Sequence, residues 1–300
     1  MQNSINNASM GRKRNISSMN IKASQSIFKV KGRPSDNPLI AHISSLEQIN
    51  LIAEEIPESF YCLAKVFFPG PLTVILKRRP EVPAIVSAGL NTIAVRMPSH
   101  PIALELISLV EEPIVAPSAN LSGKPSATQV EHVLEDFNGK IAGIIDGGKT
   151  QIGIESTVIN LLSETPILLR PGSISKEEIE QVLGYLIAEA SSKLQGPVLS
   201  PGMKYRHYAP QTPIKLFMNL QEALSYLAQD LQRRRMFLSR QPLLRQIPNI
   251  DLFSLSAREF YSLLRKADQM KYEEIIILCD LEIQKESGLM NRIIRACHCG

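Results

Sequence analysis

A short polar stretch, residues 31–42, concentrates side chains that bind anions. It opens with Lys31 and Arg33, runs through two prolines to Asn37 and ends on His42. A guanidinium group can make two parallel hydrogen bonds to a phosphate, and an ammonium group two residues away adds a compact positive charge. The prolines and a glycine favour a rigid loop over a helix interior. The stretch therefore suits a polyphosphate, and the alternative is an exposed basic turn without a ligand.

A second stretch, residues 113–128, is built for close approach to a nucleotide. It begins as a short apolar strand and then breaks into small hydroxyl and amide residues, among them Ser118, Asn120 and Thr128. Small residues let backbone N–H groups and short side chains come near a bound nucleotide. This second stretch strengthens the ligand-binding interpretation of the first.

Together with four further segments, these two stretches resemble the YrdC family, the threonylcarbamoyl-AMP synthases. The further segments are residues 92–98, 155–159, 169–172 and 200–210. The last of them resembles the linker found in the long, two-domain form of the family. Each motif alone is a weak signal, but six motifs in one order over about residues 26 to 210 argue against a chance match.

The resemblance implies an enzyme that makes threonylcarbamoyl-AMP and pyrophosphate from L-threonine, bicarbonate and ATP. A partner enzyme would then use the product to modify adenosine in tRNA. Mg²⁺ would arrive on the nucleotide, and no metal site of the protein itself is expected. The alternative is a catalytically impaired YrdC-like protein that binds nucleotide or double-stranded RNA.

The resemblance also implies a role for individual residues. The implied ATP contacts are Lys31, Arg33, Asn37, Thr92, Asn120, Thr128, Arg170 and Tyr208. The implied threonine contacts are His42, Arg96, Ser118 and Ser156. Lys31 and Arg33 are expected to be catalytic, because negative charge builds on the phosphates as pyrophosphate leaves.

The side-chain chemistry of two of these residues supports a functional role, whereas others also have a simpler interpretation. Arg96 can clamp an amino-acid carboxylate with two hydrogen bonds, and Tyr208 can fold the linker over the nucleotide as a lid. His42 could instead be a satisfied surface histidine, and Arg170 a turn residue paired with a carboxylate. Thr128 is expected to cap a helix over residues 130–137 whether or not it also meets ATP.

One part of the family pattern has no match. Proteins of the resembled family normally begin with an apolar strand and a loop whose hydroxyl contacts threonine, upstream of Lys31. Residues 10–17 stand where that loop is expected, and they are basic and polar. A truncated start, a degenerate gene and true divergence each explain the difference, and a missing strand would leave a sheet edge uncovered.

Apolar periodicity predicts an α/β fold that positions these residues. Residues 72–76, 92–97 and 144–146 are expected strands, and a helix from Pro101 is expected to bury Ile102, Leu106 and Leu109. Ser175 and Glu178 form a capping-box pattern in front of another helix. Further along, candidate strands at residues 214–217, 236–238, 252–255 and 274–279 alternate with helices, which predicts a small parallel sheet.

These patterns divide the chain into a lead, two domains and a linker. Residues 1–25 are expected to be a disordered or divergent lead, and residues 185–212 a linker. Residues 26–184 are expected to form a YrdC-like catalytic domain, a twisted mixed sheet with helices around a concave basic groove. Residues 213–300 are expected to form a smaller Rossmann-like α/β domain.

Composition narrows the possible settings. The chain has 300 residues, 44% of them hydrophobic, and a formal net charge of +4, which fits a globular protein with an anionic small-molecule substrate. No apolar run is long enough to span a membrane, and four scattered cysteines fit a reducing compartment, so a cytoplasmic location is expected. The terminal Cys297-His298-Cys299 is not expected to bind zinc.

Overall fold

The computed structural model describes residues 20–190, 208–241 and 247–297. The chain forms two compact units. The larger unit takes residues 1–118 and 155–204, and the smaller unit takes residues 119–154 and 205–300. Residues 119–154 therefore pack with the C-terminal part of the chain. The predicted domain boundaries are continuous in sequence and stay a prediction, and most of the expected linker lies outside the described residues.

An eight-stranded mixed sheet forms the centre of the larger unit. Its strands are β1 (Ile40–His42), β2 (Ala53–Glu54), β3 (Leu72–Arg78), β4 (Thr92–Arg96), β5 (Ile114–Ala116), β6 (Thr157–Asn160), β7 (Ile167–Arg170) and β8 (Ala188–Glu189). Their order is β5-β1-β4-β3-β6-β7-β8, with β2 paired to β3. The pairs β1–β4, β3–β6 and β7–β8 are parallel, and the others are antiparallel.

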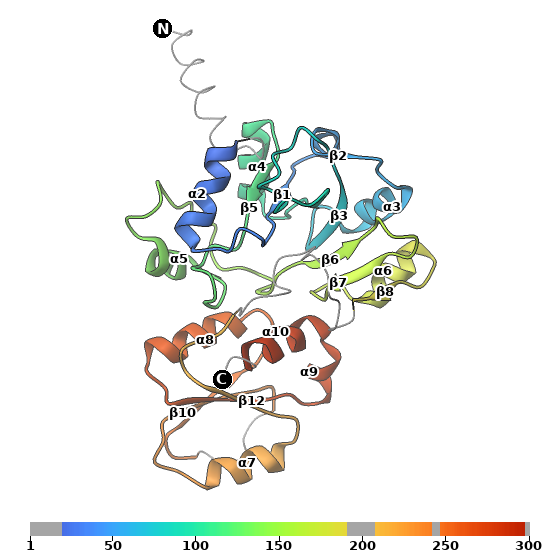
Figure 1. The fold of residues 1–300 in the computed structure, drawn as a ribbon. Coiled ribbons are helices and arrows are strands. Elements are labelled where there is room, and N and C mark those ends of the chain that lie inside the picture. The colour runs from blue at the N-terminus through green and yellow to red at the C-terminus, as the bar shows by residue number, and fades with distance from the viewer. Residues whose placement is uncertain (1–19, 191–207, 242–246, 298–300) are drawn as a thin grey trace. The chain divides into compact units, whose positions relative to one another are not determined.

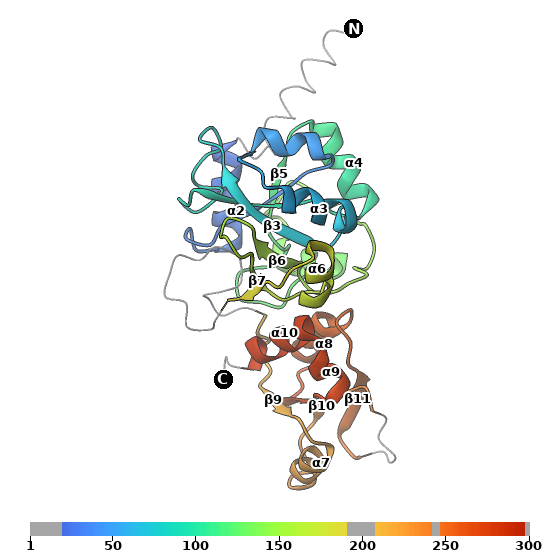
Figure 2. The ribbon, with the colours of Figure 1, turned by 90° about the vertical axis from the view of Figure 1, so that its right-hand side faces the viewer.

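The two faces of this sheet are packed differently. Because strand side chains alternate between faces, Val74, Val95 and Ile159 point into a large apolar cluster, and Ile75 and Ala94 point into a small cluster on the opposite face. The large cluster is closed by side chains from the helices α2 (Ile21–Lys31), α3 (Glu58–Phe67) and α6 (Lys176–Leu183). Figure 2 shows α3 and α6 next to one another.

Helix α2 begins within the expected N-terminal lead. Asn20 is its N-cap and accepts a hydrogen bond from the backbone N–H of Ala23, and Gly32 ends it in the left-handed conformation that glycine adopts without strain. Residues 21–25 are therefore helical, because a capped start and a buried Phe28 outweigh their polar composition. The remainder of that lead, with residues 10–17, lies outside the described residues.

The smaller unit is a three-layer arrangement around a parallel sheet. Its strands β9 (Ile214–Phe217), β10 (Arg235–Ser239), β11 (Ile250–Ser254) and β12 (Glu274–Leu278) lie in the order β11-β10-β12-β9. Helix α7 (Leu220–Ala228) packs on one face, and α8 (Phe260–Gln269), α9 (Leu281–Lys285) and α10 (Ser287–Cys297) pack on the other (Figure 1). The mixed sheet and this parallel sheet confirm the predicted α/β fold class.

Local predictions had mixed outcomes. Ser175 and Glu178 form both hydrogen bonds of the capping box of α6, as predicted. Helix α4 (Pro101–Val110) begins at the expected proline, but Ile107 and Val110 are its buried residues, whereas Ile102, Leu106 and Leu109 are exposed. The prediction of the buried face was wrong because apolar residues lie on most sides of this helix. No strand forms at residues 144–146. Among the described residues, no helix is both long and apolar enough to cross a membrane.

We expect Gly172→Ala to destabilise the larger unit by about 2 kcal/mol or more. A Cβ at Gly172 would press on the backbone N of Thr157 and lie 2.7 Å from the carbonyl carbon of Ser156, and backbone atoms cannot move aside cheaply. Urea unfolding measures the change. Gly143→Ala is the matched control, since a Cβ there meets nothing within 4 Å. Equal free energies of unfolding for the two variants would contradict this packing.

Candidate active site

The register of the larger sheet places three of the predicted site residues in one row. His42 on β1 pairs directly with Arg96 on β4. Arg96 follows Val95, which pairs with Val74, so the next residue pair across β4 and β3 brings Arg96 opposite Thr73. Thr73 pairs with Val158, and Val158 pairs with Arg170. Residues opposite one another in a sheet point to the same face, so His42, Arg96 and Arg170 share a face. That face is the one with the small apolar cluster.

Ser156 joins this row through a buried hydrogen-bond network. The guanidinium group of Arg170 donates to the carbonyl oxygen of Ser156 from Nε at 3.1 Å and from Nη2 at 2.9 Å. The same Nη2 lies 3.2 Å from Ser156 Oγ, which also shares a 2.7 Å hydrogen bond with Thr73 Oγ1. Arg170, Ser156 and Thr73 are all buried. The structure therefore holds Arg170 in a buried network and does not place it in an exposed turn.

The charges of Arg96 and Arg170 act on each other. Arg96 is partly buried, and its Nε donates to the carbonyl oxygen of Gly70 at 3.0 Å. Burial, and then the positive charge of Arg170, lower the pKa of Arg96 to about 10. The guanidinium group stays protonated at neutral pH. A carboxylate or phosphate bound at this row would relieve the repulsion between the two arginines, which makes the row suited to an anion.

His42 is neutral at physiological pH. Burial, followed by the charge of Arg96, lowers the pKa of His42 to about 4. A neutral imidazole can accept or donate a hydrogen bond but is a weak base at this pKa. His42 is therefore suited to orienting a ligand, and the structure corrects its interpretation as an ordinary surface histidine.

Lys31 ends α2, and the loop after this helix brings Arg33 and Asn37 together. Lys31 is buried at the last turn of α2, and its Nζ lies 2.5 Å from the carbonyl oxygen of Ser118. Arg33 donates to the backbone oxygens of Asn37 and Pro38, and its Nη2 donates to Asn37 Oδ1 at 2.7 Å. The loop is thus ordered by its own arginine.

Asn37 leaves a buried donor directed elsewhere. Because Oδ1 of its amide accepts from Arg33, the Nδ2 group faces away from that bond. Asn37 is 1% exposed, and its Nδ2 has no acceptor within the described residues. Buried donors are nearly always satisfied in proteins, so a bound acceptor such as a phosphate or sugar oxygen fits this position.

The smaller unit holds three predicted ATP contacts, which are Asn120, Thr128 and Tyr208. Asn120 is buried, and its Nδ2 donates to the carbonyl oxygens of Leu121 and Lys124. Thr128 is also buried, and its backbone N–H donates to Nδ1 of His132 at 3.2 Å. The N-cap of α5 (Val130–Phe137) is Gln129, without a side-chain cap bond. Thr128 is therefore not the helix cap that the sequence predicted: the N-cap position falls one residue later, and the Thr128 hydroxyl lies 3.4 Å from Nδ1 of His132.

Tyr208 and Thr92 are placed differently from the other predicted residues. Tyr208 is buried in the core of the smaller unit, where its ring packs 5.2 Å from that of Tyr261. In the described structure the ring is thus a core element, and the expected lid role stays a prediction. Thr92 begins β4, so three residues separate it from Arg96 at the other end of the strand. The structure does not bring Thr92 next to that row.

Sequence reasoning missed Thr73 and the carbonyl oxygen of Gly70. Thr73 lies inside an apolar strand, where a threonine gives no signal of function, and it became visible only through its hydrogen bond to Ser156. Gly70 acts through its backbone, which carries no sequence signal. Both residues hold the predicted site residues in place.

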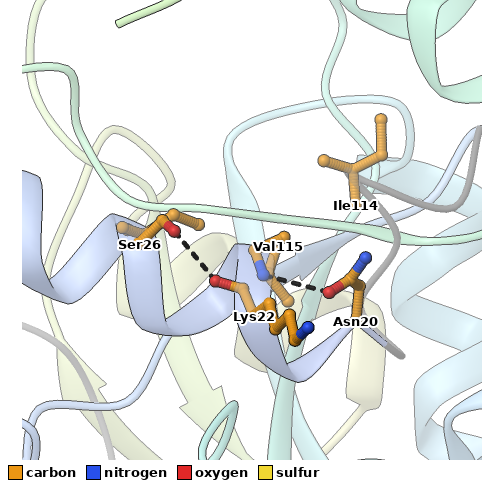
Figure 3. A pocket seen from close by; sticks show the side chains of 7 residues that line it. Asn20, Lys22, Ser26, Ile114 and Val115 are labelled. Atoms are coloured by element: carbon orange, nitrogen blue, oxygen red, sulfur yellow. Dashed lines mark hydrogen bonds between the residues drawn. The ribbon is translucent and has the colours of Figure 1, made fainter. Parts of the chain in front are cut away.

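A pocket of about 440 Å³ lies apart from these residues. It is bordered by α2 and the edge strand β5, and Figure 3 shows its labelled side chains with the hydrogen bonds of Asn20 and Ser26 within α2. Its lining residues are Asn20, Lys22, Ala23, Ser26, Ile27, Ile114 and Val115. None of the residues predicted to contact ATP or threonine lines it, so we do not include it in the candidate site.

The free energy of unfolding should decrease as the pH falls, because of His42. The pKa of His42 is about 4 in the folded chain, against an ordinary value of 6.5. The unfolded chain therefore binds a proton first as the pH falls, and the stability present above about pH 6.5 is lost toward about pH 4. His42→Gln should remove about 2 kcal/mol of the difference between about pH 7 and about pH 5, as measured by urea unfolding.

His100→Gln, at an exposed histidine, is the matched control for this pH dependence and should leave it unchanged. A wild-type chain and a His42→Gln chain with the same pH dependence would show that His42 is not a buried neutral histidine.

Two family models match the chain. The model of the Sua5, YciO and YrdC proteins, described as telomere recombination, matches residues 16–172. The model described as threonylcarbamoyl-AMP synthase, C-terminal domain, matches residues 174–297. Together they cover almost the whole of the described structure.

Curated relatives and a solved structure agree with these matches. A threonylcarbamoyl-AMP synthase of Pyrococcus abyssi is 56% identical over 190 residues, which are 63% of this chain and 56% of that protein. One from Bacillus subtilis is 41% identical over 290 residues, or 92% of this chain and 84% of that protein. The crystal structure of P. abyssi Sua5 complexed with L-threonine aligns with a TM-score of 0.86 at 41% identity, over 94% of this chain and 86% of that one.

Proposed function

The chain belongs to the Sua5, YciO and YrdC family, and from this premise we propose that it is a threonylcarbamoyl-AMP synthase. Its substrates are L-threonine, bicarbonate and ATP, and its products are threonylcarbamoyl-AMP, pyrophosphate and water. The observation that carries the proposal is the row of His42, Arg96 and Arg170 with the adjoining Ser156, which offers charge and hydrogen bonds suited to an amino acid.

In the proposed reaction threonine is held by His42, Arg96, Ser118 and Ser156. Its carboxylate lies against Arg96, whose charge is destabilised by burial and by the charge of Arg170. His42 and Ser156 orient the amine and hydroxyl groups, and Ser118 adds a further hydroxyl. A histidine with a pKa of about 4 is too weak a base to deprotonate the amine efficiently. The site therefore acts on threonine by orientation more than by proton transfer.

Two bond-forming steps follow. The threonine nitrogen attacks the carbon of bicarbonate, and loss of water leaves a carbamate. A carbamate oxygen then attacks the α-phosphorus of ATP, and the bond from that phosphorus to the pyrophosphate oxygen breaks. Both steps depend on holding unstable partners in line and away from water.

Lys31, Arg33 and Asn37 contact ATP in this proposal. Lys31 and Arg33 stabilise the charge that grows on the phosphates as pyrophosphate leaves. Asn37 supplies its buried Nδ2 donor. The remaining proposed ATP contacts are Thr92, Asn120, Thr128, Arg170 and Tyr208.

Mg²⁺ enters with the nucleotide in this proposal. Phosphate oxygens and water supply most ligands of a nucleotide-bound Mg²⁺, so few protein ligands are needed. Within the described parts of the chain, no three His, Cys, Asp or Glu side chains are grouped to hold a metal. We further propose that the product passes to a partner enzyme that modifies adenosine in tRNA in the cytoplasm.

The double variant Lys31→Ala, Arg33→Ala should release pyrophosphate at least about a hundredfold more slowly than the wild type. The two side chains carry the charge that stabilises the leaving group, and release should require threonine, bicarbonate and ATP together. A coupled pyrophosphate assay measures the rate.

Lys29→Ala is the matched control for this variant, because Lys29 is an exposed lysine in the same last turn of α2. It should retain the wild-type rate. A double variant with full activity would exclude the proposed catalytic roles of Lys31 and Arg33.

A further inference from the structure

A buried arginine of α8 lies against the segment that carries two of the proposed ATP contacts. Arg265 is 3% exposed, and it donates to the carbonyl oxygen of Pro125 from Nε at 3.1 Å and from Nη2 at 2.8 Å. Residues 120–128, here called the 120–128 loop, include both that carbonyl and the proposed contacts Asn120 and Thr128. The arginine and the loop are 140 residues apart in sequence and belong to the same compact unit.

Asp136 of α5 joins Arg265 to the start of the loop. Its Oδ2 accepts from Arg265 Nη2 at 2.7 Å and from the backbone N–H of Leu121 at 3.1 Å. Its Oδ1 accepts from Lys124 Nζ at 2.8 Å. Although burial opposes ionisation, the hydrogen bonds from Arg265, Lys124 and Leu121 hold the pKa of Asp136 below its ordinary value. One buried carboxylate therefore ties α8 to two positions of the loop.

The loop transmits this arrangement to Asn120. The side-chain amide of Asn120 donates to the carbonyl oxygens of Leu121 at 2.9 Å and Lys124 at 3.0 Å. Leu121 and Lys124 are the same residues that Asp136 holds. Displacing Asp136 would remove a hydrogen bond from each of these two residues, whose carbonyl oxygens hold the Asn120 amide.

We propose that Arg265 is a positioning residue for ATP binding. It fixes the 120–128 loop at Pro125 directly and at Leu121 and Lys124 through Asp136, and so sets the orientation of Asn120 in that loop. The inference rests on the proposed function, in which Asn120 contacts ATP. It gives helix α8, far along the chain from the anion-binding stretches, a defined role in the affinity for the nucleotide.

The chemistry of the contact requires arginine. A guanidinium fork reaches one carbonyl oxygen with two N–H groups while it also donates to the carboxylate of Asp136 and lies 3.3 Å from that of Glu135. An ammonium group of lysine is a single point and cannot occupy these positions together. Removal of the guanidinium group would leave the buried Asp136 with less compensation, which disturbs its surroundings.

The test compares the binding of ATP and of L-threonine to Arg265→Met by isothermal titration of the full chain. The dissociation constant for ATP should rise about tenfold. The dissociation constant for threonine should change less than about twofold, because the four proposed threonine contacts belong to the other unit. Amide hydrogen exchange at Leu121 should become faster in the variant, since its acceptor is displaced.

Arg235→Met is the matched control. Arg235 is another buried arginine of the same unit, 2% exposed, with Nη1 2.6 Å from the carbonyl oxygen of Asp230 and Nε 3.0 Å from Glu274 Oε2. Its loss should lower stability to a similar extent and leave ATP binding unchanged. Arg265→Lys and Asp136→Asn disturb the same contacts more mildly, and both should weaken ATP binding. They take the place of Arg265→Met in the test if that variant does not fold.

Three results overturn the inference. They are an unchanged ATP dissociation constant in the folded Arg265 and Asp136 variants, an equal loss of ATP affinity in Arg235→Met, and an equal loss of ATP and threonine affinity in Arg265→Met. In each of these the wild type binds ATP, so the proposed function survives. A wild-type chain that binds no ATP overturns the proposed function, and the inference falls with it.

Discussion

Two positive charges brought close to one another in a partly buried region are the constraint on which the larger unit depends. Arg96 and Arg170 lie in the same row of the sheet, and the charge of Arg170 helps to lower the pKa of Arg96. Like charges taken out of water are costly unless neighbouring groups compensate them. The carbonyl oxygens of Gly70 and Ser156 supply part of that compensation. The glycine at 172 lets the chain pass close to Ser156, which keeps its carbonyl in place.

This constraint explains why the residues of the row come from separate strands. A parallel pair sets His42 beside Arg96, and the antiparallel β7 returns Arg170 to the same row. Each residue ends its own strand, so the polar side chains gather where strand pairing gives way to loops. The apolar clusters on both faces then hold this polar row without taking part in it. Rigid strands position the charges more accurately than loops would.

The sequence predicted the parts of the fold that depend on local patterns. The strands over residues 72–76 and 92–97, the parallel sheet of the smaller unit and the capping box at Ser175 all follow from short-range spacing. The sequence did not predict the packing that depends on contacts between distant segments. The packing of residues 119–154 with the C-terminal part depends on the buried contacts of Arg265 with Pro125 and Asp136, which no local pattern reveals.

The same distinction applies to the site. Lys31, Arg33, Arg96 and Ser156 were predicted because their motifs are contiguous in sequence, whereas Thr73 and Gly70 act through burial and backbone atoms. Thr128 was predicted from local spacing to cap a helix over residues 130–137, whereas Gln129 holds the N-cap position and the Thr128 hydroxyl lies near Nδ1 of His132. The buried face of α4 could not be read from a helix that is apolar on most sides. Tertiary contacts determine the roles of Thr73 and Gly70, the surroundings of Thr128 and the buried face of α4.

The most direct test of this account is the binding of L-threonine compared with that of L-threoninamide, its uncharged counterpart, by isothermal titration of the intact chain. If Arg96 binds the amino acid through its carboxylate, threonine should bind at least about tenfold more tightly than the amide. Equal affinities for the two compounds, or no binding of threonine, would contradict the account.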